Sequence, residues 1–305
     1  MITKTIKTIA VLMFAVVFTA SAQLKEIGGF QNPESVIALG DKLYVTNLGA
    51  QLDPTAKDGD GFISVLNRKD GKMIQEKFIS GLNSPKGMLA GHGYLLVTDV
   101  DKVLIFKIKT GKKVWEASLE KQGVTYANDM VKVCGGVLVS STDKNAIYKI
   151  NMKGKVTMLP VKVDLPGANG LAKGCGKLFV ANYGRGNNTD GSFGKVGLCN
   201  KKFTALQNGG MYDGIVKKGH CLIVTDWVSA TENKGRLVAY SLCKKQSAEI
   251  NIGRTINGPA DIYKDCKTKT LWVPAMRENQ IIGVPYDMIK KSIKATMAKQ
   301  AKKKK

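Results

Sequence analysis

The sequence predicts an all-β fold, a six-bladed β-propeller, because one short phrase returns six times along the chain. Each copy contains a turn with a polar residue, an apolar strand, a Gly-rich or Lys-rich turn and a second apolar strand. The copies are centred on Glu34, Lys86, Asn128, Asn169, Asp213 and Asp261. Self-similarity at a period of roughly 40 to 50 residues, built from short strands, is typical of propeller blades.

The third copy illustrates the strands expected in one blade. Asp129–Val133 forms an inner strand, Val137–Ser140 returns, Asn145–Ile150 follows, and Lys155–Leu159 forms an outer strand. Gly-rich or polar turns separate these runs, as four antiparallel strands require. The sixth copy lacks a fourth strand, and Leu24–Phe30 before the first blade has the pattern of the missing one. We therefore expect an N-terminal strand to close the last blade and remove an exposed sheet edge.

The N-terminus has the pattern of a secretory signal peptide. Lys4 and Lys7 precede the apolar run Thr8–Thr19, and Ala20-Ser21-Ala22 provides the small residues of a cleavage site. The apolar run is shorter than the ~20 residues that span a bilayer, which argues against a membrane anchor. We predict a signal peptide over residues 1–22, a propeller over 23–288 and a periplasmic or secreted protein.

The C-terminus concentrates positive charge in a Lys-rich tail, residues 289–305. The whole chain has 47 Lys and Arg against 24 Asp and Glu, a net charge of +23. Such a tail favours electrostatic contact with an anionic surface. A solvated, mobile end that aids solubility is an equal alternative. We expect a monomer with a small-molecule substrate and no nucleic-acid partner.

Six cysteines are consistent with export. Four fall at the turn after an inner strand and two follow a third strand, so all lie at one face of the predicted propeller. No CxxC occurs, which argues against a zinc ribbon or a thioredoxin-like motif. The expected disulfides join successive blades: Cys134 with Cys175, Cys199 with Cys221, and Cys243 with Cys266. Reduced, buried cysteines remain the alternative.

The starts of the inner strands share one face of the predicted propeller, where they surround its axis. The polar residues there are Glu34, Lys86, Asn128, Asn169, Asp213 and Asp261, and further out lie Asn47, Asp99, Asp143, Asn182, Asp226 and Arg277. Carboxylate and amide oxygens that converge from several blades are the ligands that a hard cation such as calcium prefers. This pattern predicts a divalent metal on the axis.

At these positions the chain resembles the gluconolactonase and regucalcin (senescence marker protein) family of six-bladed propellers. Glu34 in the first blade, Asn128 in the third, Asn169-Gly170 in the fourth and Asp213-Gly214 in the fifth match the family's metal ligands in identity and order. The resemblance implies that these four residues hold a divalent metal, with calcium expected. It also implies that Asp213 is the catalytic nucleophile or the base that aligns water.

The chain departs from this family in ways that bear on the substrate. Tyr126 stands where the lactonases carry a sugar-binding Arg, which argues against a sugar lactone. Lys86 brings a cation to the axis, where it either replaces the metal by pairing with Glu34 or Asp213 or holds an anionic substrate. The predicted substrate contacts are Lys86, Asp261, Arg277, Asn182 and Asp226. Both histidines, His92 and His220, fall on the opposite face, which argues against a mechanism like that of streptogramin lyases.

Two functions remain open at this point. The first is an exported, calcium-type metal-dependent hydrolase of a lactone or a related ester. The second is a non-enzymatic propeller that binds a protein, an envelope polymer or a small anion. Leu95–Asp99 and Leu222–Asp226 resemble the NHL type of repeat, which often serves as an interaction platform.

Overall fold

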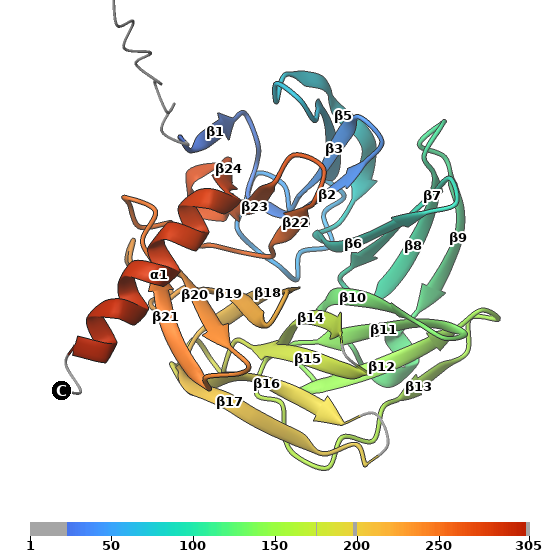
Figure 1. The fold of residues 1–305 in the computed structure, drawn as a ribbon. Coiled ribbons are helices and arrows are strands. Elements are labelled where there is room, and N and C mark those ends of the chain that lie inside the picture. The colour runs from blue at the N-terminus through green and yellow to red at the C-terminus, as the bar shows by residue number, and fades with distance from the viewer. Residues whose placement is uncertain (1–22, 175, 198–199, 303–305) are drawn as a thin grey trace, which may run out of the picture.

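Six four-stranded antiparallel sheets form a closed ring in the computed structural model, which describes residues 23–174, 176–197 and 200–302 (Figure 1). The six-bladed β-propeller predicted from the sequence is therefore confirmed. The predicted signal peptide, residues 1–22, lies outside the described residues. Among those described, no helix is long and apolar enough to cross a membrane.

In blades 1 to 5 the four strands follow the chain from the axis outward, and in blade 6 the outer strand comes from the N-terminus. Blade 1 contains β2 (Pro33–Leu39), β3 (Lys42–Asn47), β4 (Gly61–Asn67) and β5 (Met73–Leu82). Blade 2 contains β6 (Pro85–Gly91), β7 (Tyr94–Asp99), β8 (Lys102–Lys107) and β9 (Lys113–Ser118). Blade 3 contains β10 (Ala127–Val133), β11 (Gly136–Ser141), β12 (Ala146–Asn151) and β13 (Val156–Met158).

The second half of the ring repeats this order. Blade 4 contains β14 (Ala168–Gly174), β15 (Lys177–Asn182), β16 (Gly191–Gly197) and β17 (Phe203–Gly210). Blade 5 contains β18 (Tyr212–Lys218), β19 (Cys221–Asp226), β20 (Arg236–Ser241) and β21 (Gln246–Ile250). Blade 6 contains β22 (Tyr263–Asp265), β23 (Thr270–Ala275), β24 (Gln280–Pro285) and β1 (Lys25–Gly28). Two short 3₁₀ helices, η1 (Glu120–Gln122) and η2 (Met276–Glu278), lie between strands.

The two ends of the propeller meet in blade 6, as the sequence predicted. Strand β1 pairs antiparallel with β24, with Lys25 opposite Gly283 and Gly28 opposite Gln280. The N-terminal strand thereby satisfies the outer edge of β24, which would otherwise present unpaired backbone groups to solvent. The ring is closed by hydrogen bonds between segments at opposite ends of the propeller sequence.

The inner strands share a local irregularity that sets the direction of their polar residues. The register with the second strand shifts at the same place in blades 1 to 5, where each inner strand carries its axial residue and the residue after it. Such a β-bulge bends the strand and redirects a side chain. The bulges turn the residues Glu34, Lys86, Asn128, Asn169 and Asp213 out of the regular alternation of strand side chains.

Glycine follows the axial residue where neighbouring blades approach most closely. A Cβ at Gly170 would lie 2.2 Å from the carbonyl oxygen of Asp213, and a Cβ at Gly214 would lie 2.5 Å from the backbone nitrogen of Ile262. No side chain fits at these distances, so glycine is required by close backbone approach. The Asn-Gly and Asp-Gly pairs seen in the sequence therefore have a packing reason that is independent of any ligand.

The propeller has two faces, which carry opposite ends of its strands. We call the face with the starts of the inner strands the cavity face. The turn face carries the turns between first and second strands and between third and fourth strands, which include the described residues 40–41, 68–72, 92–93, 108–112, 134–135, 152–155, 176, 200–202, 219–220, 242–245 and 266–269.

Helix α1 (Tyr286–Lys302) continues directly from the last strand and lies along the outer strand of blade 5 (Figure 1). Tyr286 and Ile289 are buried in the cluster that fills the space between blades 5 and 6. The Ser292 hydroxyl accepts a hydrogen bond of 2.6 Å from the Asn251 amide, and the Thr296 hydroxyl donates to the Glu249 carbonyl at 3.3 Å. The first turns of the Lys-rich segment are thus docked against the propeller.

The cysteines do not form the disulfide that the sequence predicted between Cys243 and Cys266. Both are free thiols, as are Cys134 and Cys221. The other predicted partners, Cys175 and Cys199, lie outside the described residues. The thiol of Cys221 has a raised pKa because of burial and the nearby Cys243, since both lie on blade 5. Sequence order misled the prediction because it favoured links between successive blades over contacts within one blade.

We predict that Ile289→Ala destabilises the protein by about 2 to 4 kcal/mol, because the substitution leaves a cavity under α1. Ile289 is 2% exposed. Urea denaturation monitored by circular dichroism measures this change. Lys294→Ala, on the exposed side of the same helix, is the matched control and should change the free energy of unfolding by less than about 0.5 kcal/mol. Equal stability of Ile289→Ala and the wild type would contradict the docked helix.

Candidate functional site

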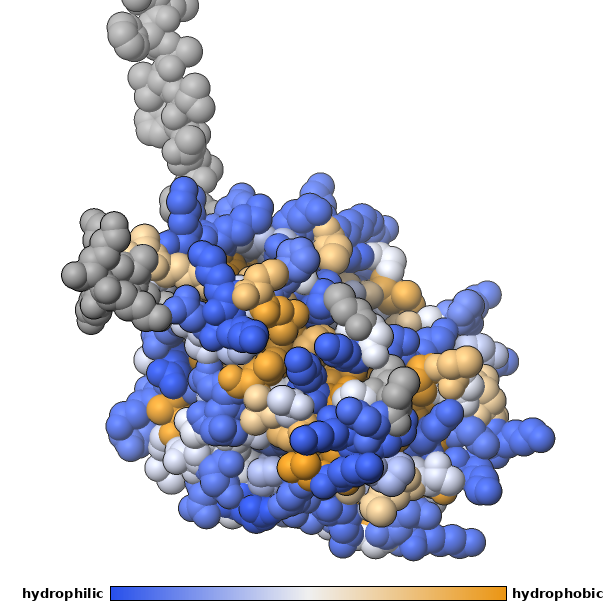
Figure 2. All heavy atoms as spheres, turned by 60° about the horizontal axis from the view of Figure 1, so that its bottom comes forward, coloured by the Kyte–Doolittle hydropathy of each residue, from blue (hydrophilic) through white to orange (hydrophobic). Residues whose placement is uncertain are grey.

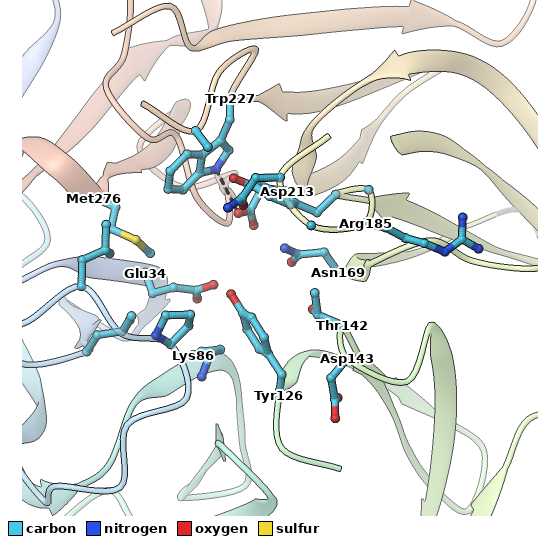
Figure 3. Close-up of a pocket in the computed structure, with 18 of the residues that line it drawn as sticks. Glu34, Lys86, Tyr126, Thr142, Asp143, Asn169, Arg185, Asp213, Trp227 and Met276 are labelled. Carbon is cyan, nitrogen blue, oxygen red and sulfur yellow. Dashed lines mark hydrogen bonds between the residues drawn. The ribbon is translucent and has the colours of Figure 1, made fainter. Parts of the chain in front are cut away.

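A cavity of about 590 Å³ opens on the cavity face at the propeller axis (Figure 3). Its residues come from all six blades or the loops between them. Polar lining residues include Glu34, Lys86, Tyr126, Thr142, Asn169, Asp213, Arg185 and Arg277, and apolar ones include Leu48, Leu52, Pro54, Tyr183, Trp227 and Met276. The volume suits a small organic ligand rather than a polymer.

Two buried carboxylates in this cavity each have an oxygen without a hydrogen-bond partner. Glu34 is 3% exposed and Asp213 is 4% exposed. Trp227 Nε1 donates a hydrogen bond of 3.0 Å to Asp213 Oδ2, while Asp213 Oδ1 and Glu34 Oε2 remain unpartnered. Buried polar atoms are almost always paired in native structures. These two oxygens are therefore available to a ligand.

Burial and mutual repulsion make both carboxyl groups hard to ionise. Desolvation raises the pKa of Glu34 well above its ordinary value, and Asp213 and Asp261 raise it further. Desolvation, together with Asp261, raises the pKa of Asp213 to about 8, against the lowering effect of contacts from Trp227 and Asn169. Nearby like charges and loss of water both disfavour a carboxylate. A bound cation would reverse this penalty by neutralising the pair.

Lys86 is the cation nearest to these carboxylates, yet it does not pair with either of them. Its side chain is fully buried, and Nζ donates a hydrogen bond of 2.8 Å to the Ser84 carbonyl. Nζ also lies 4.9 Å from the centre of the Tyr126 ring. Desolvation lowers the Lys86 pKa to about 8, although Glu34 and Asp99 act to raise it. No ion pair between Lys86 and a carboxylate occurs among the described residues.

The apolar wall of the cavity was missed by the sequence analysis. In blades 1, 4 and 5 it chose Asn47, Asn182 and Asp226, each one position before the residue that lines the cavity, and in blade 6 it chose Arg277, one position after Met276. Leu48, Tyr183, Trp227 and Met276 each directly follow the last residue of a second strand. Thr142 follows β11 in the same way. The position after the strand, not its last residue, turns toward the axis. The repeat alignment already contained this signal, because the same offset recurs in five blades.

The wall is held together by aromatic contacts. The rings of Tyr183 and Trp227 meet edge to face at 5.7 Å. The Arg277 guanidinium lies 5.7 Å from the centre of the Trp227 ring. Leu48 and Met276 pack into the same cluster with Trp227. Figure 3 shows the hydroxyl of Tyr126 pointing toward the carboxylate of Glu34, opposite this wall. Burial, with Asp213 and Glu34 nearby, raises the Tyr126 pKa well above 10, so this hydroxyl keeps its proton.

The structure brings five of the predicted site residues to the cavity: Glu34, Lys86, Asn169, Asp213 and Arg277. Asn128 is buried beside them, where its Nδ2 donates a hydrogen bond of 3.1 Å to the hydroxyl of Thr142. Asn128 thus contacts a residue that lines the cavity.

Three other predicted residues lie away from this cavity. Asp261 lines a second cavity on the turn face and accepts hydrogen bonds from Ser35 Oγ at 2.7 Å and from the Ile262 amide at 2.7 Å. Asp226 accepts from the backbone amides of Met211 and Val228, both at 3.1 Å, and pairs with Arg236. Asn182 is fully buried and donates to Ser192 Oγ at 3.1 Å. In these contacts Asp226 and Asn182 brace the blades.

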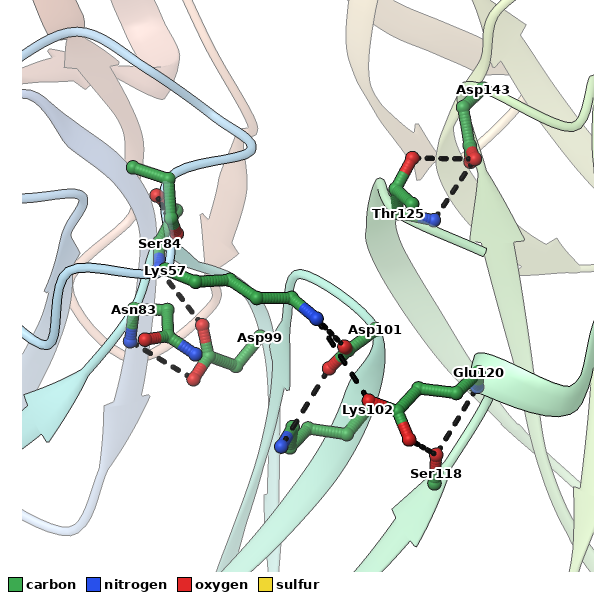
Figure 4. Close-up of polar contacts among 11 residues, drawn as sticks. Lys57, Asn83, Ser84, Asp99, Asp101, Lys102, Ser118, Glu120, Thr125 and Asp143 are labelled. Carbon is green, nitrogen blue, oxygen red and sulfur yellow. Dashed lines mark hydrogen bonds and ion pairs between the residues drawn. The ribbon is translucent and has the colours of Figure 1, made fainter. Parts of the chain in front are cut away.

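Two further carboxylates near the ends of second strands fix the loops around the cavity (Figure 4). Asp99 accepts hydrogen bonds from the amides of Asn83 and Ser84, at 3.1 and 2.9 Å. Asp143 accepts 2.9 Å hydrogen bonds from both the amide and the hydroxyl of Thr125, next to Tyr126. These contacts replace solvent around the loop amides, so the cavity rim has a defined shape.

The donor set fits a hard divalent cation. Glu34, Asn169 and Asp213 supply oxygen atoms from three blades, and two of the carboxylate oxygens have no other partner. Calcium takes six to eight oxygens, and water or substrate would supply the remainder. Across the described residues, no group of three or more His, Cys, Asp or Glu side chains forms a metal cluster. A cation here would therefore depend on an amide oxygen beside two carboxylates.

Solved structures with a similar fold include two enzymes of different activity. Virginiamycin B lyase from Staphylococcus aureus is 14% identical over 86% of this chain and 98% of its own, with a TM-score of 0.55. Luciferin-regenerating enzyme is 12% identical over 86% of this chain and 94% of its own, with a TM-score of 0.61. The likeness shows the six-bladed fold. The sequence matches no protein-family model and no curated protein.

We predict that the protein loses stability as the pH rises from 5 to 8 in the presence of a chelator. The pKa of Asp213 is about 8 in the folded state against an ordinary 3.8, so the unfolded chain releases this proton first. Asp213→Asn should flatten the fall in Tm over this range, whereas the exposed Asp58→Asn should not. An identical pH profile for Asp213→Asn and the wild type would contradict the raised pKa.

Proposed function

We propose that this protein is an exported, metal-dependent hydrolase of a lactone or a related ester. Glu34, Asn169 and Asp213 would hold a calcium-type cation on the axis, with Asn128 supporting the site through Thr142. The observation that carries the proposal is the pair of unpartnered, buried carboxylate oxygens on Glu34 and Asp213. The match of Glu34, Asn128, Asn169-Gly170 and Asp213-Gly214 to gluconolactonases and regucalcin supports it.

Different residues of the cavity would have different roles in hydrolysis. When bound, a divalent cation acts as a Lewis acid toward a carbonyl oxygen. Asp213 is oriented by Trp227, whose Nε1 holds Oδ2 and leaves Oδ1 available to take a proton from water or to attack the carbonyl. The protonated Tyr126 hydroxyl can donate a hydrogen bond to the leaving oxygen. Trp227, Tyr183 and Met276 exclude water from one side of the cavity.

The cavity favours a substrate with an apolar part. Leu48, Tyr183, Trp227 and Met276 form its wall, and Tyr126 stands where the related lactonases carry an Arg. A wall of this kind buries alkyl or aromatic groups and offers few partners to sugar hydroxyls. Lys86 would attract the carboxylate that ring opening releases. We therefore propose alkyl or aryl lactones and esters as the substrate class.

Lys86 also favours the second candidate function, a non-enzymatic propeller that binds a small anion. Its ammonium group is buried at the cavity and lacks a carboxylate partner among the described residues. Arg277 adds positive charge at the wall. An anion held by Lys86 needs no divalent cation, so the two functions differ in whether metal binds.

We predict that calcium raises the Tm of the chelated protein by several degrees and that Glu34→Gln abolishes the shift. A ligand that binds only the folded state stabilises it by about 2.7 kcal/mol at a hundredfold excess over its Kd. Differential scanning fluorimetry with calcium, magnesium and manganese measures the shift. The surface variant Glu232→Gln is the control and should keep the wild-type response. No shift with any of the three metals would favour the anion-binding function.

We predict that Asp213→Asn lowers kcat for lactone and ester hydrolysis by at least about a hundredfold, because the variant removes the proton acceptor. Its Tm in chelator should stay at or above that of the wild type, since it also removes a desolvated carboxylate. A screen of alkyl and aryl lactones by pH-stat measures the rate. Undiminished hydrolysis by Asp213→Asn would place the catalytic group elsewhere.

A further inference from the structure

The two faces of the propeller differ sharply in charge. The turns of the turn face contain two acids, Asp41 and Asp70, among the described residues. Their basic residues are Arg68, Lys69, Lys72, Lys109, Lys112, Lys153, Lys155, Lys201, Lys202, Lys244, Lys245, Lys267 and Lys269. Figure 2 views this face and shows hydrophilic side chains over most of it. The net charge of the protein is therefore concentrated on one side.

On the cavity face, by contrast, several basic side chains form ion pairs with acidic ones. Lys57 pairs with Asp101, as Figure 4 shows, and Arg185 pairs with Asp164. Lys234 pairs with Glu232. These loops therefore present an electrostatically mixed surface around the cavity mouth. An anionic surface would be attracted to the opposite side of the protein, and the cavity would stay open to solvent.

Four lysines in the outer turns of blades 1 to 3 lack a carboxylate partner among the described residues. Lys72, Lys112, Lys153 and Lys155 are exposed, and no carboxylate of the described residues pairs with them. On this face Arg68 pairs with Asp265, and Lys267 pairs with Asp41. The unpaired lysines lie at three neighbouring outer turns of the ring. We call these lysines the basic rim; an external anion can neutralise them.

Exposed apolar side chains stand among these lysines. Ile74 is 52% exposed, two residues after Lys72. Trp115 is 39% exposed, three residues after Lys112, and Met152 is 83% exposed next to Lys153. Blades 2 and 3 are in contact here, because a Cβ at Gly154 would lie 2.7 Å from the Trp115 ring. Lysines around Trp and aliphatic side chains are typical of surfaces that enter the headgroup region of a bilayer.

The axial channel opens on the same face through a second cavity of about 280 Å³. Apolar side chains of the inner strands line it, including Met88, Met130 and Ile262, and Lys173 and Lys217 also contribute. Figure 2 shows hydrophobic side chains gathered near the middle of this face. An apolar surface surrounded by lysines can contact both the acyl chains and the anionic headgroups of a bilayer. A linear polyanion would engage the lysines alone.

We propose that the turn face docks on a lipid bilayer that carries anionic headgroups, with the rim of blades 1 to 3 as the contact. Trp115 and Met152 enter the interfacial layer, while Lys72, Lys112, Lys153 and Lys155 neutralise lipid phosphates. Helix α1, which begins at this face, adds Lys290 and Lys291. The cavity face then points away from the membrane, so a substrate reaches the cavity from solution. This orientation does not depend on what the cavity binds.

The test is co-sedimentation of the chain from residue 23 onward with vesicles of phosphatidylcholine, with or without phosphatidylglycerol. This chain keeps all the described strands and α1 and removes the apolar run Thr8–Thr19, which would itself partition into lipid. Binding should require phosphatidylglycerol and weaken at high salt. Lys153→Glu with Lys155→Glu should weaken it at least about tenfold. Lys121→Glu with Lys234→Glu, an equal charge change on the cavity face, should change it less than about twofold.

Fluorescence provides an independent measurement, because Trp227 and Trp272 are buried whereas Trp115 is partly exposed. Anionic vesicles should shift the emission to shorter wavelength, and Trp115→Phe should abolish the shift. Circular dichroism and Tm verify that each variant is folded. Equal loss of binding in both double variants would overturn the proposed face. Binding to heparin without binding to vesicles would overturn the proposed membrane contact and favour a linear polyanion as the partner.

Discussion

Close packing of the inner strands around the axis is the constraint on which the rest of this structure depends. Thr46 Oγ1 donates a 3.0 Å hydrogen bond to the Lys86 carbonyl of the next blade, and Thr225 Oγ1 donates a 2.8 Å bond to the Ala260 carbonyl. Thr98 makes the same contact with Asn128. In the contacts of Thr46 and Thr98, these hydroxyls satisfy carbonyls of bulged residues in the next blade. Each blade therefore fixes the position of the next axial residue.

This packing has an electrostatic cost at the axis. Glu34, Asp129, Asp213 and Asp261 are drawn into a low-dielectric interior, and burial raises the pKa of all four. Asp129 and Asp261 are compensated by backbone amides, since Asp129 accepts from Met130 and Leu171 and Asp261 accepts from Ile262. Glu34 and Asp213 keep an unpartnered oxygen each. Asp129 and Asp261 are thus held by backbone amides, whereas Glu34 and Asp213 are available to a ligand.

The same topology assigns different tasks to the two faces. Long loops on the cavity face carry acids that cap neighbouring amides, as Asp99 and Asp143 do. Short turns on the turn face carry lysines, because tight turns expose their side chains to solvent. The two proposals are therefore compatible, since the cavity and the basic rim occupy opposite sides of one rigid ring. Helix α1 strengthens this division by covering the backbone edge of β21.

The sequence by itself determined the blade number, the closing strand and the axial positions, because these follow from a repeat with local periodicity. It also identified Glu34, Asn169 and Asp213 as residues that share one cavity. It failed for Asn182 and Asp226, because strand alternation does not reveal that the residue after the strand turns inward. The cysteine contacts were equally hidden, since sequence order does not specify which turns lie within bonding distance.

Only the tertiary structure decided which polar groups have partners. Asp213 and Asp226 look alike in the sequence, each beside apolar strand residues, yet Asp226 is fully engaged by Met211, Val228 and Arg236 while Asp213 retains a free oxygen. The physical reason is that hydrogen-bond satisfaction depends on atoms contributed by distant segments. The uneven distribution of charge also depends on the tertiary structure, because the topology places the lysine-rich turns of the blades on one face.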